Sequence, residues 1–129
     1  MNSYSLEGSA RDRQDVALKA FARIADAWSL APHEAATLAD MSEVIWEQAR
    51  QSGCVGELSS DQMLRLSALI GLYTSLELYF DRPTSRDWVR MPNGGPELGG
   101  ASPIDAMIAG GLSRILRMRG YVDALREGV

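Results

Sequence analysis

Apolar residues recur at helical spacing along most of the chain, and no stretch shows the sustained alternation of a β-strand. The first helical pattern begins at Asp15, a residue type that favours the N-cap position. The preceding residues 1–14 are polar and lack a period, which predicts a flexible N-terminal tail. The apolar positions of this first predicted helix are Val16, Leu18, Phe21, Ile24, Ala25 and Trp28.

Two short helical patterns follow in close succession. Pro32 suits the first position of a helix over residues 32–39, because its missing N–H group is not needed there. A break at residues 40–42 separates it from a second helix over 42–51. Two short helices with such a break predict a helix-turn-helix unit, in which Trp46 lies beneath the second helix.

The longest apolar pattern covers residues 60–80. Ser59 or Ser60 is the expected cap, and the segment is apolar on nearly all sides, which is typical of a helix at the centre of a core. Pro83 ends it. A short helix through Trp88 and Val89 is expected next.

Glycine and proline dominate residues 92–100, which predicts a loop. Ser102 followed by Pro103 predicts a new helix start. The pair Gly110-Gly111 should break or bend that helix, and a last amphipathic helix runs from Leu112 to about residue 126. The chain is therefore predicted to be all-α, with about six or seven helices.

Composition narrows the function classes. The chain has 129 residues and a net charge of −4, so it offers no general attraction to nucleic acid. A single cysteine excludes an intrachain disulfide, and no apolar run approaches the ~18 residues of a membrane span. The polar N-terminus lacks the apolar region of a signal peptide. We expect a soluble cytoplasmic protein.

No group of residues predicts catalysis. His33, the only histidine, follows Pro32 at a helix start and is expected at the surface. Cys54 lies between glycine-containing turns without a histidine partner, so it is interpreted as a structural residue and not as a nucleophile. No Cys/His spacing fits a metal site. The glycine pairs do not follow a strand or precede Lys-Ser/Thr, so they are not a phosphate loop. We expect no enzyme activity, cofactor or metal.

The second helix of the helix-turn-helix unit is the candidate DNA-binding element. Gln48 and Gln51 have side chains that can bind adenine edges, and Arg50 can contact phosphate or guanine. Glu43 and Glu47 would repel phosphate. A helix bundle without strong DNA affinity is therefore an equal alternative. The candidate DNA-binding residues are Ser42, Glu43, Gln48, Arg50 and Gln51.

The C-terminal third carries a more specific pattern. Trp88 precedes Met91-Pro92-Asn93, then come Leu98-Gly99-Gly100 and Ser102-Pro103-Ile104-Asp105. In order and spacing this run resembles the toxin-binding domain of the Xre/MbcA/ParS antitoxin family. That domain typically shows a Trp, two or three residues, Pro-Asn, and then Gly-Gly or Gly-Lys before a small residue, Pro and an aliphatic-Asp pair. The loop over residues 94–97 is slightly longer than the family pattern.

The resemblance implies an Xre-like helix-turn-helix domain over 15–80 and a toxin-binding domain over 81–129. It implies a cognate RES-type toxin, which degrades NAD, as the partner. Such antitoxins cover the active-site cleft of the toxin and commonly repress their own operon. It also implies a homodimer or a hetero-oligomer with the toxin. The toxin-binding candidates are Trp88, Met91, Pro92, Asn93, Gly99, Gly100, Pro103, Arg114, Arg117, Met118, Arg119 and Tyr121.

Two alternatives stay open from the sequence. The arginines of the last helix either pair with acidic groups of a toxin or form a solvated helix face. Likewise, Trp88 and the Pro-Asn and Gly-Gly turns either touch a partner or only shape the domain. The competing function is a DNA-binding regulator or adaptor without a toxin.

Overall fold

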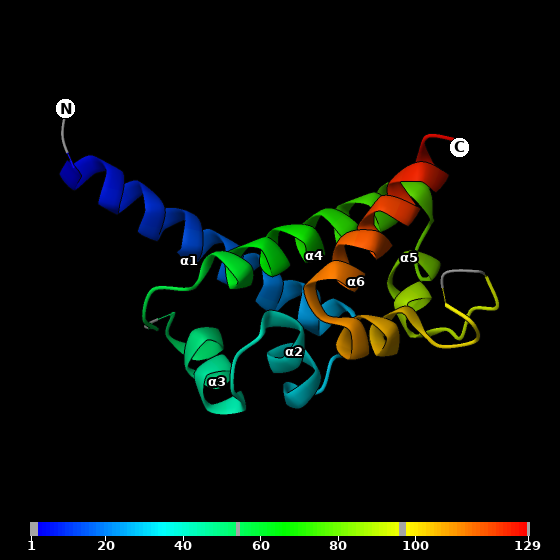
Figure 1. Cartoon of the computed structure of the whole chain (residues 1–129), viewed down its shortest axis with the longest axis horizontal. Helices are drawn as coiled ribbons and strands as arrows, with labels where there is room; N and C mark the ends of the chain where they lie inside the picture. The colour runs from blue at the N-terminus through cyan, green and yellow to red at the C-terminus, as the bar shows by residue number, and fades with distance from the viewer. Residues whose placement is uncertain (1–2, 54, 96–97, 129) are drawn as a thin grey trace.

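The computed structural model describes residues 3–53, 55–95 and 98–128, which form helices and loops without a strand. The expected all-α class is confirmed. Figure 1 shows α4 at the centre, with α1 and α6 beside it and the short α2 and α3 below. The helices are α1 (Ser3–Ala27), α2 (Pro32–Ala39), α3 (Glu43–Gln51), α4 (Ser60–Tyr79), α5 (Thr84–Asp87), the 3₁₀-helix η1 (Trp88–Arg90) and α6 (Pro103–Arg126).

Helix α1 begins twelve residues earlier than the apolar pattern indicates. It starts at Ser3, so the predicted helix start with Asp15 as N-cap is wrong, and the segment predicted as a tail is helical from Ser3. Once a helix has formed on a packed segment, each further residue adds a hydrogen bond at little cost, and helix extension does not need apolar periodicity. Gln14 also ties α1 to the loop before α4: its amide donates to the carbonyl of Gly56 at 3.0 Å and accepts from the N–H of Leu58 at 2.9 Å.

The α2–turn–α3 unit follows the sequence closely. Pro32 occupies the first turn of α2, and Asp40 ends the helix with a left-handed backbone. The Ser42 hydroxyl accepts a hydrogen bond from the N–H of Ile45 at 3.1 Å, which makes Ser42 the N-cap of α3. Trp46 is buried beneath α3, as expected, with its ring 5.2 Å from that of Phe21 on α1.

Helix α4 supplies the middle of the core. The Ser59 hydroxyl accepts a hydrogen bond from the N–H of Gln62. The Gln62 side chain accepts one from the N–H of Ser59 at 2.8 Å, and the two bonds form a capping box. The expectation of a central helix is confirmed, because α4 packs against α1, α2 and α6 and four of its leucines are fully buried, although Leu64 and Leu78 are exposed. The fully buried leucines of α4 are Leu66, Leu69, Leu72 and Leu76.

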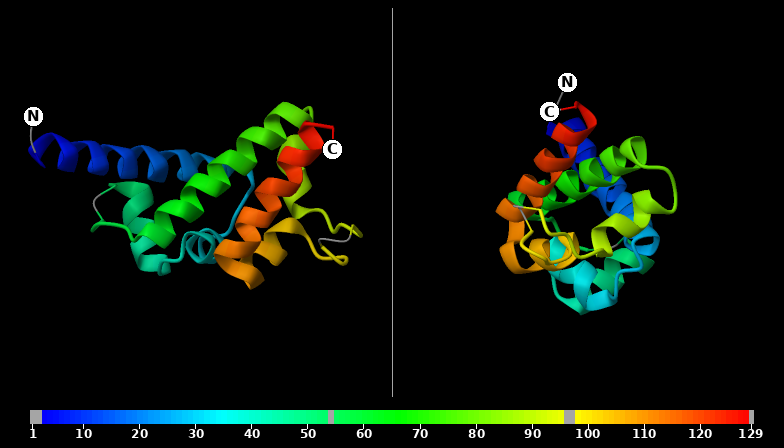
Figure 2. Two further views of the ribbon diagram at one scale, coloured as in Figure 1. Left: turned by 45° about the horizontal axis from the view of Figure 1, so that its top comes forward. Right: turned by 90° about the vertical axis from the view of Figure 1, so that its right-hand side faces the viewer.

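Helix α6 covers α4 only after a sharp change of direction. The expected break at Gly110-Gly111 is confirmed: Gly111 has φ 69° and ψ −153°, a conformation that is not helical. Figure 2 shows the segment before the break and the segment after it running in different directions. The second segment runs beside α4, where the Ser75 hydroxyl donates to the carboxylate of Asp123.

One continuous core joins the two predicted domains. Buried residues such as Phe21 of α1 and Trp28, which follows α1, belong to the same cluster as Ile104, Met107 and Ile115 of α6. The predicted parts 15–80 and 81–129 are therefore packed together through α4 and α6. Among the helices that the structure describes, none is both long and apolar enough to cross a membrane.

Gly111→Ala is expected to destabilise the protein. Its backbone lies in a region that essentially only glycine adopts, and forcing another residue there costs on the order of 1–3 kcal/mol. Urea unfolding followed by circular dichroism measures the change in the free energy of unfolding.

Gly120→Ala, in the same helix, is the matched control. An added Cβ there meets no atom within 4 Å, and alanine suits a helix interior better than glycine, by roughly 0.5–1 kcal/mol. The two substitutions should therefore shift the stability in opposite directions. Equal effects would show that the bend at Gly111 does not constrain the fold.

Candidate functional site

The loop between η1 and α6 is held by its own backbone. The N–H of Asn93 donates to the carbonyl of Ala101 at 3.1 Å, and the N–H of Gly100 donates to the carbonyl of Asn93 at 2.8 Å. The Asn93 side chain also accepts from the N–H of Gly95 at 2.8 Å, which closes an Asx turn. Gly99 and Gly100 both have positive φ, at 56° and 95°, so the glycine pair is needed for this return.

The end of the loop is fixed by a helix cap and an aromatic stack. The Ser102 hydroxyl accepts from the N–H of Asp105 at 3.1 Å, so the expected start of α6 is confirmed. Trp88 stacks on Tyr121 of α6 with ring centroids 6.4 Å apart, and Phe80 of α4 lies on Trp88 at the same distance. The Trp, Pro-Asn, Gly-Gly and Ser-Pro motifs thus form one loop with a defined shape.

The sequence-predicted toxin-binding residues divide by exposure. Trp88, Pro103 and Met118 are buried, so in this conformation they act on a partner only through the shape of the loop and of α6. Tyr121 and Asn93 are half-buried. The exposed residues of the loop, which a partner can touch directly, are Met91, Pro92, Gly99 and Gly100.

The arginines of α6 do not form one uniform face. Arg117 is exposed, whereas Arg114 and Arg119 are half-buried. Arg119 lies across Gly71 of α4, where a Cβ would collide with its guanidinium group. Its Nε is 3.7 Å from the carboxylate of Asp123. Part of the positive charge of α6 is therefore paired within the protein.

Arg90 is a structural residue that the sequence pattern did not single out. It donates to the carbonyls of Trp28 at 3.0 Å and Ser29 at 2.7 Å, where α1 ends, and to the carboxylate of Glu34 at 2.6 Å. These bonds tie η1 to the turn between α1 and α2. The hydrogen bond from Arg90 lowers the pKa of Glu34 below its ordinary value. The sequence gives no indication of this role for Arg90, because its hydrogen-bond partners lie more than fifty residues away along the chain.

The exposed face of α3 is occupied by its own charges. Arg50 donates to both carboxylate oxygens of Glu47, the nearer at 2.8 Å, and Gln51 donates to Glu47 at 3.1 Å. The hydrogen bond from Arg50 lowers the pKa of Glu47. Ser42 caps the helix, and Glu43 and Gln48 are exposed. Two of the three residues expected to read DNA therefore engage a carboxylate of the same helix.

Two candidates for chemistry from the sequence remain, His33 and Cys54. His33 is exposed in the first turn of α2, as expected, and Cys54 lies outside the described residues. Within residues 3–53, 55–95 and 98–128, no three His, Cys, Asp or Glu side chains are grouped as a metal site would require.

The fold and these surfaces define a small all-helical protein with a shaped loop between η1 and α6. Its sequence is 34% identical over 113 residues to the uncharacterized protein y4oB of Sinorhizobium fredii, a match that covers 86% of this chain and 84% of y4oB. The chain belongs to the same family as y4oB. No family model and no solved structure matches it.

The Arg90–Glu34 pair is expected to make stability depend on pH. Because the pKa of Glu34 is lowered on folding, the pair stabilises the protein above the unfolded-state pKa of about 4.3. This contribution is lost as the pH falls through the folded-state pKa. Glu34→Gln should lower the free energy of unfolding at pH 7 and lower it by less at pH 3, as measured by urea unfolding.

Glu43→Gln serves as the comparison, because Glu43 is exposed in the first turn of α3, away from Arg90. It should show a smaller difference between the two pH values. An equal loss for Glu34→Gln at both pH values would contradict the role of the carboxylate charge.

Proposed function

We propose that this protein is the antitoxin of a toxin–antitoxin pair, and that it binds a RES-type NAD-degrading toxin through the loop between η1 and α6 and the adjoining face of α6. The proposal rests on the resemblance of the motifs from Trp88 to Asp105 to the toxin-binding domain of Xre/MbcA/ParS antitoxins. The observation that supports it is the shape of the loop, which is held by bonds of Asn93, Gly100 and Ser102 and presents Met91 and Pro92 at the surface.

The loop has the properties of a protein-binding surface and not of a catalytic site. Among its described residues, the N–H groups of Asn93, Gly99 and Gly100 donate to carbonyls of the same loop, and the Asn93 side chain closes a turn. Preorganisation of this kind reduces the entropy lost on binding. Met91 projects an apolar side chain that is 43% exposed, beside the exposed Pro92. An exposed methionine offers an adaptable apolar contact for a partner.

The exposed Arg117 of α6 adds a positive charge to the candidate surface. A cleft that holds NAD must favour the negative pyrophosphate and would repel an arginine. We therefore expect Arg117 to contact acidic groups on the rim of the toxin cleft. Rim charges of this kind raise the association rate more than the affinity. The apolar contact at Met91 would therefore contribute more of the affinity than Arg117.

Met91→Glu is expected to abolish or strongly weaken neutralisation. The substitution removes an apolar contact and places an unpaired charge in the interface, so the affinity should fall roughly tenfold or more. The proposal implies that a RES-type toxin is encoded beside this gene, and co-expression with that toxin should show growth with the unchanged protein and toxicity with the variant. Affinity co-purification measures the complex directly.

Val44→Glu is the matched control, because Val44 is also exposed and apolar but lies on α3. It should protect cells as the unchanged protein does. Equal protection by both variants, or no complex with the unchanged protein, would contradict the proposed function.

A second candidate activity is binding of operator DNA through α3, either as autorepression or as the function of a regulator without a toxin. The arrangement of α2, the three-residue turn and the capped α3 favours it. The carboxylate of Glu47 opposes it, because it neutralises Arg50 and repels phosphate.

Glu47→Gln is therefore expected to strengthen DNA binding, roughly two- to tenfold at low salt, because it removes a negative charge and releases Arg50. A mobility-shift titration with the upstream DNA at several salt concentrations measures it. Arg50→Gln should have the opposite effect. If neither the unchanged protein nor Glu47→Gln shifts the DNA at low salt, this candidate activity is excluded.

A further inference from the structure

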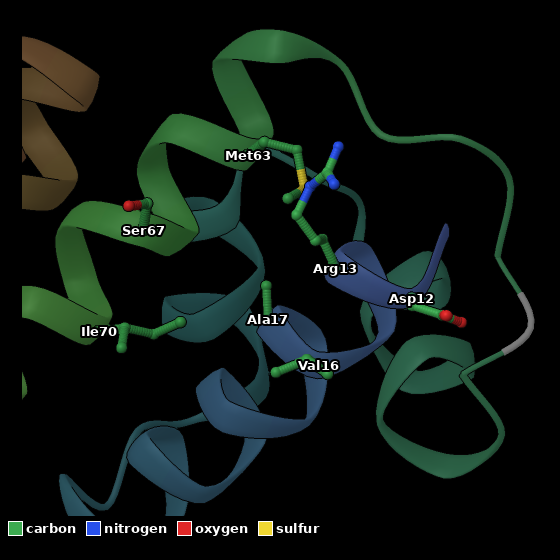
Figure 3. A pocket seen from close by; sticks show the side chains of 7 residues that line it. All are labelled: Asp12, Arg13, Val16, Ala17, Met63, Ser67 and Ile70. Atoms are coloured by element: carbon green, nitrogen blue, oxygen red, sulfur yellow. The ribbon is translucent and has the colours of Figure 1, made fainter. Parts of the chain in front are cut away.

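Two hollows open beside α1, and their linings differ. The first, of about 410 Å³, lies between α1 and α4. Figure 3 shows apolar side chains around it, with Arg13 against Met63 and with Asp12 pointing away from α4. A pocket fixes the orientation of its ligand through a few placed polar groups, so a mainly apolar lining of this kind does not select one ligand.

The second hollow is larger, about 560 Å³, and charged side chains from two helices line it. Arg23 of α1 and Arg86 of α5 both belong to its wall, although more than sixty residues separate them in the sequence. Tyr73 of α4 also lines it. Pockets of this volume are typical of small-molecule sites. The fold therefore brings two guanidinium groups to one pocket of a suitable size.

Arg86 is held in place by its neighbours and keeps donors for a ligand. Its Nη2 donates to the hydroxyl of Tyr73 at 3.3 Å, and its Nε is 3.8 Å from the carboxylate of Glu77. That Nε is buried without a hydrogen bond, so the positive charge of the group is only partly compensated. Within the part of the chain that the structure describes, its Nη1 donates to no other residue. A guanidinium group fixed in this way loses less entropy when it binds an anion.

The charge around the second hollow is positive. Among the described residues, Arg23 is exposed and makes no hydrogen bond or ion pair. The one carboxylate of Glu77 is shared, because Arg82 lies 2.9 Å from it and Arg86 lies 3.8 Å from it. The whole chain has a net charge of −4, whereas three arginines are close to two carboxylates here: Arg23, Arg82 and Arg86 against Asp26 and Glu77. The hollow therefore favours an anionic ligand.

The rest of the wall provides apolar and aromatic contacts. Three aliphatic residues of α1 line it, namely Ala20, Ile24 and Ala27. The ring of Tyr73 packs on that of Trp28 with the centroids 6.0 Å apart, and this contact fixes its position. A flat ring of a ligand can pack against such side chains, because aromatic side chains stack on flat rings of many kinds.

The polar groups narrow the class of ligand further. A guanidinium group binds phosphate through two parallel hydrogen bonds, and two such groups suit the double negative charge of a phosphate monoester. The exposed carboxylate of Asp26 can accept hydrogen bonds from hydroxyl groups, as carboxylates do from ribose. A nucleoside monophosphate carries all three matching features: a phosphate, sugar hydroxyls and a flat ring.

We propose that the hollow between α1, α4 and α5 binds a nucleoside monophosphate. Arg23 and Arg86 bind the phosphate. Asp26 accepts hydrogen bonds from the sugar hydroxyls, and the base packs against Tyr73. None of these residues belongs to α3 or to the loop between η1 and α6. The site therefore adds a small-molecule binding activity that does not depend on the proposed toxin.

The first test compares a nucleotide with its parts. Titration calorimetry of the full chain with AMP should show binding to a single site per chain. Adenosine lacks the phosphate and inorganic phosphate lacks the ring, so each should bind roughly tenfold more weakly, or less well still. Added NaCl should weaken the binding of AMP, because salt screens the exposed Arg23.

The second test locates the site. Arg23→Gln should weaken the binding of AMP roughly tenfold, because it removes a charged donor from the phosphate. Arg11→Gln is the matched control, since Arg11 is also exposed on α1 but lies roughly 18 Å further along the helix, beyond the screening length of about 10 Å. It should leave the binding unchanged. Arg86→Gln should act as Arg23→Gln does, and circular dichroism checks its fold, because Arg86 also contacts Tyr73 and Glu77.

Several results would overturn the proposal. An absence of binding with AMP at about 1 mM excludes the site. Inorganic phosphate that binds as tightly as AMP indicates a general anion patch, and adenosine that does so shows that the arginines hold no phosphate. An equal effect of Arg23→Gln and Arg11→Gln indicates attraction by overall charge only. All of these measurements use the chain alone, so their outcome is separate from that of the antitoxin function.

Discussion

The apolar surface of α4 is the constraint on which the rest of the structure depends. A helix that is apolar on nearly all sides cannot be shielded by one neighbour, so other helices must pack against several of its faces. Helix α1 lies on one side and the second segment of α6 on another, and the short α2 packs below. Burial of Leu66, Leu69, Leu72 and Leu76 is the result.

The bend at Gly111 follows from that constraint. The first segment of α6 buries Ile104 and Met107 near η1 and α2, and the second buries Ile115, Met118 and Val122 near α4. One straight helix could not serve both positions. The same bend fixes where α6 begins, and with it the end of the loop that starts after η1. The shape of the candidate binding loop is thus linked to the packing of the core.

The sequence predicted those parts of the fold that local chemistry decides. Ser42, Ser59 and Ser102 cap helices because a side-chain oxygen satisfies nearby N–H groups, and glycine at 111 permits a backbone that other residues avoid. The start of α1 was missed because helix extension leaves no apolar pattern, and the bonds of Gln14 join residues more than forty positions apart.

The candidate site was predictable as a motif but not as a surface. The sequence analysis selected Trp88, Pro103 and Met118 as well as Met91. Tertiary packing buries the first three and leaves Met91 exposed, and the sequence does not show this difference. The ion pair of Arg90 with Glu34 shows the same limit, because it depends on how η1 meets α2. In the opposite direction, the pairing of Glu47 with Arg50 could be read from their spacing of three residues on a helix.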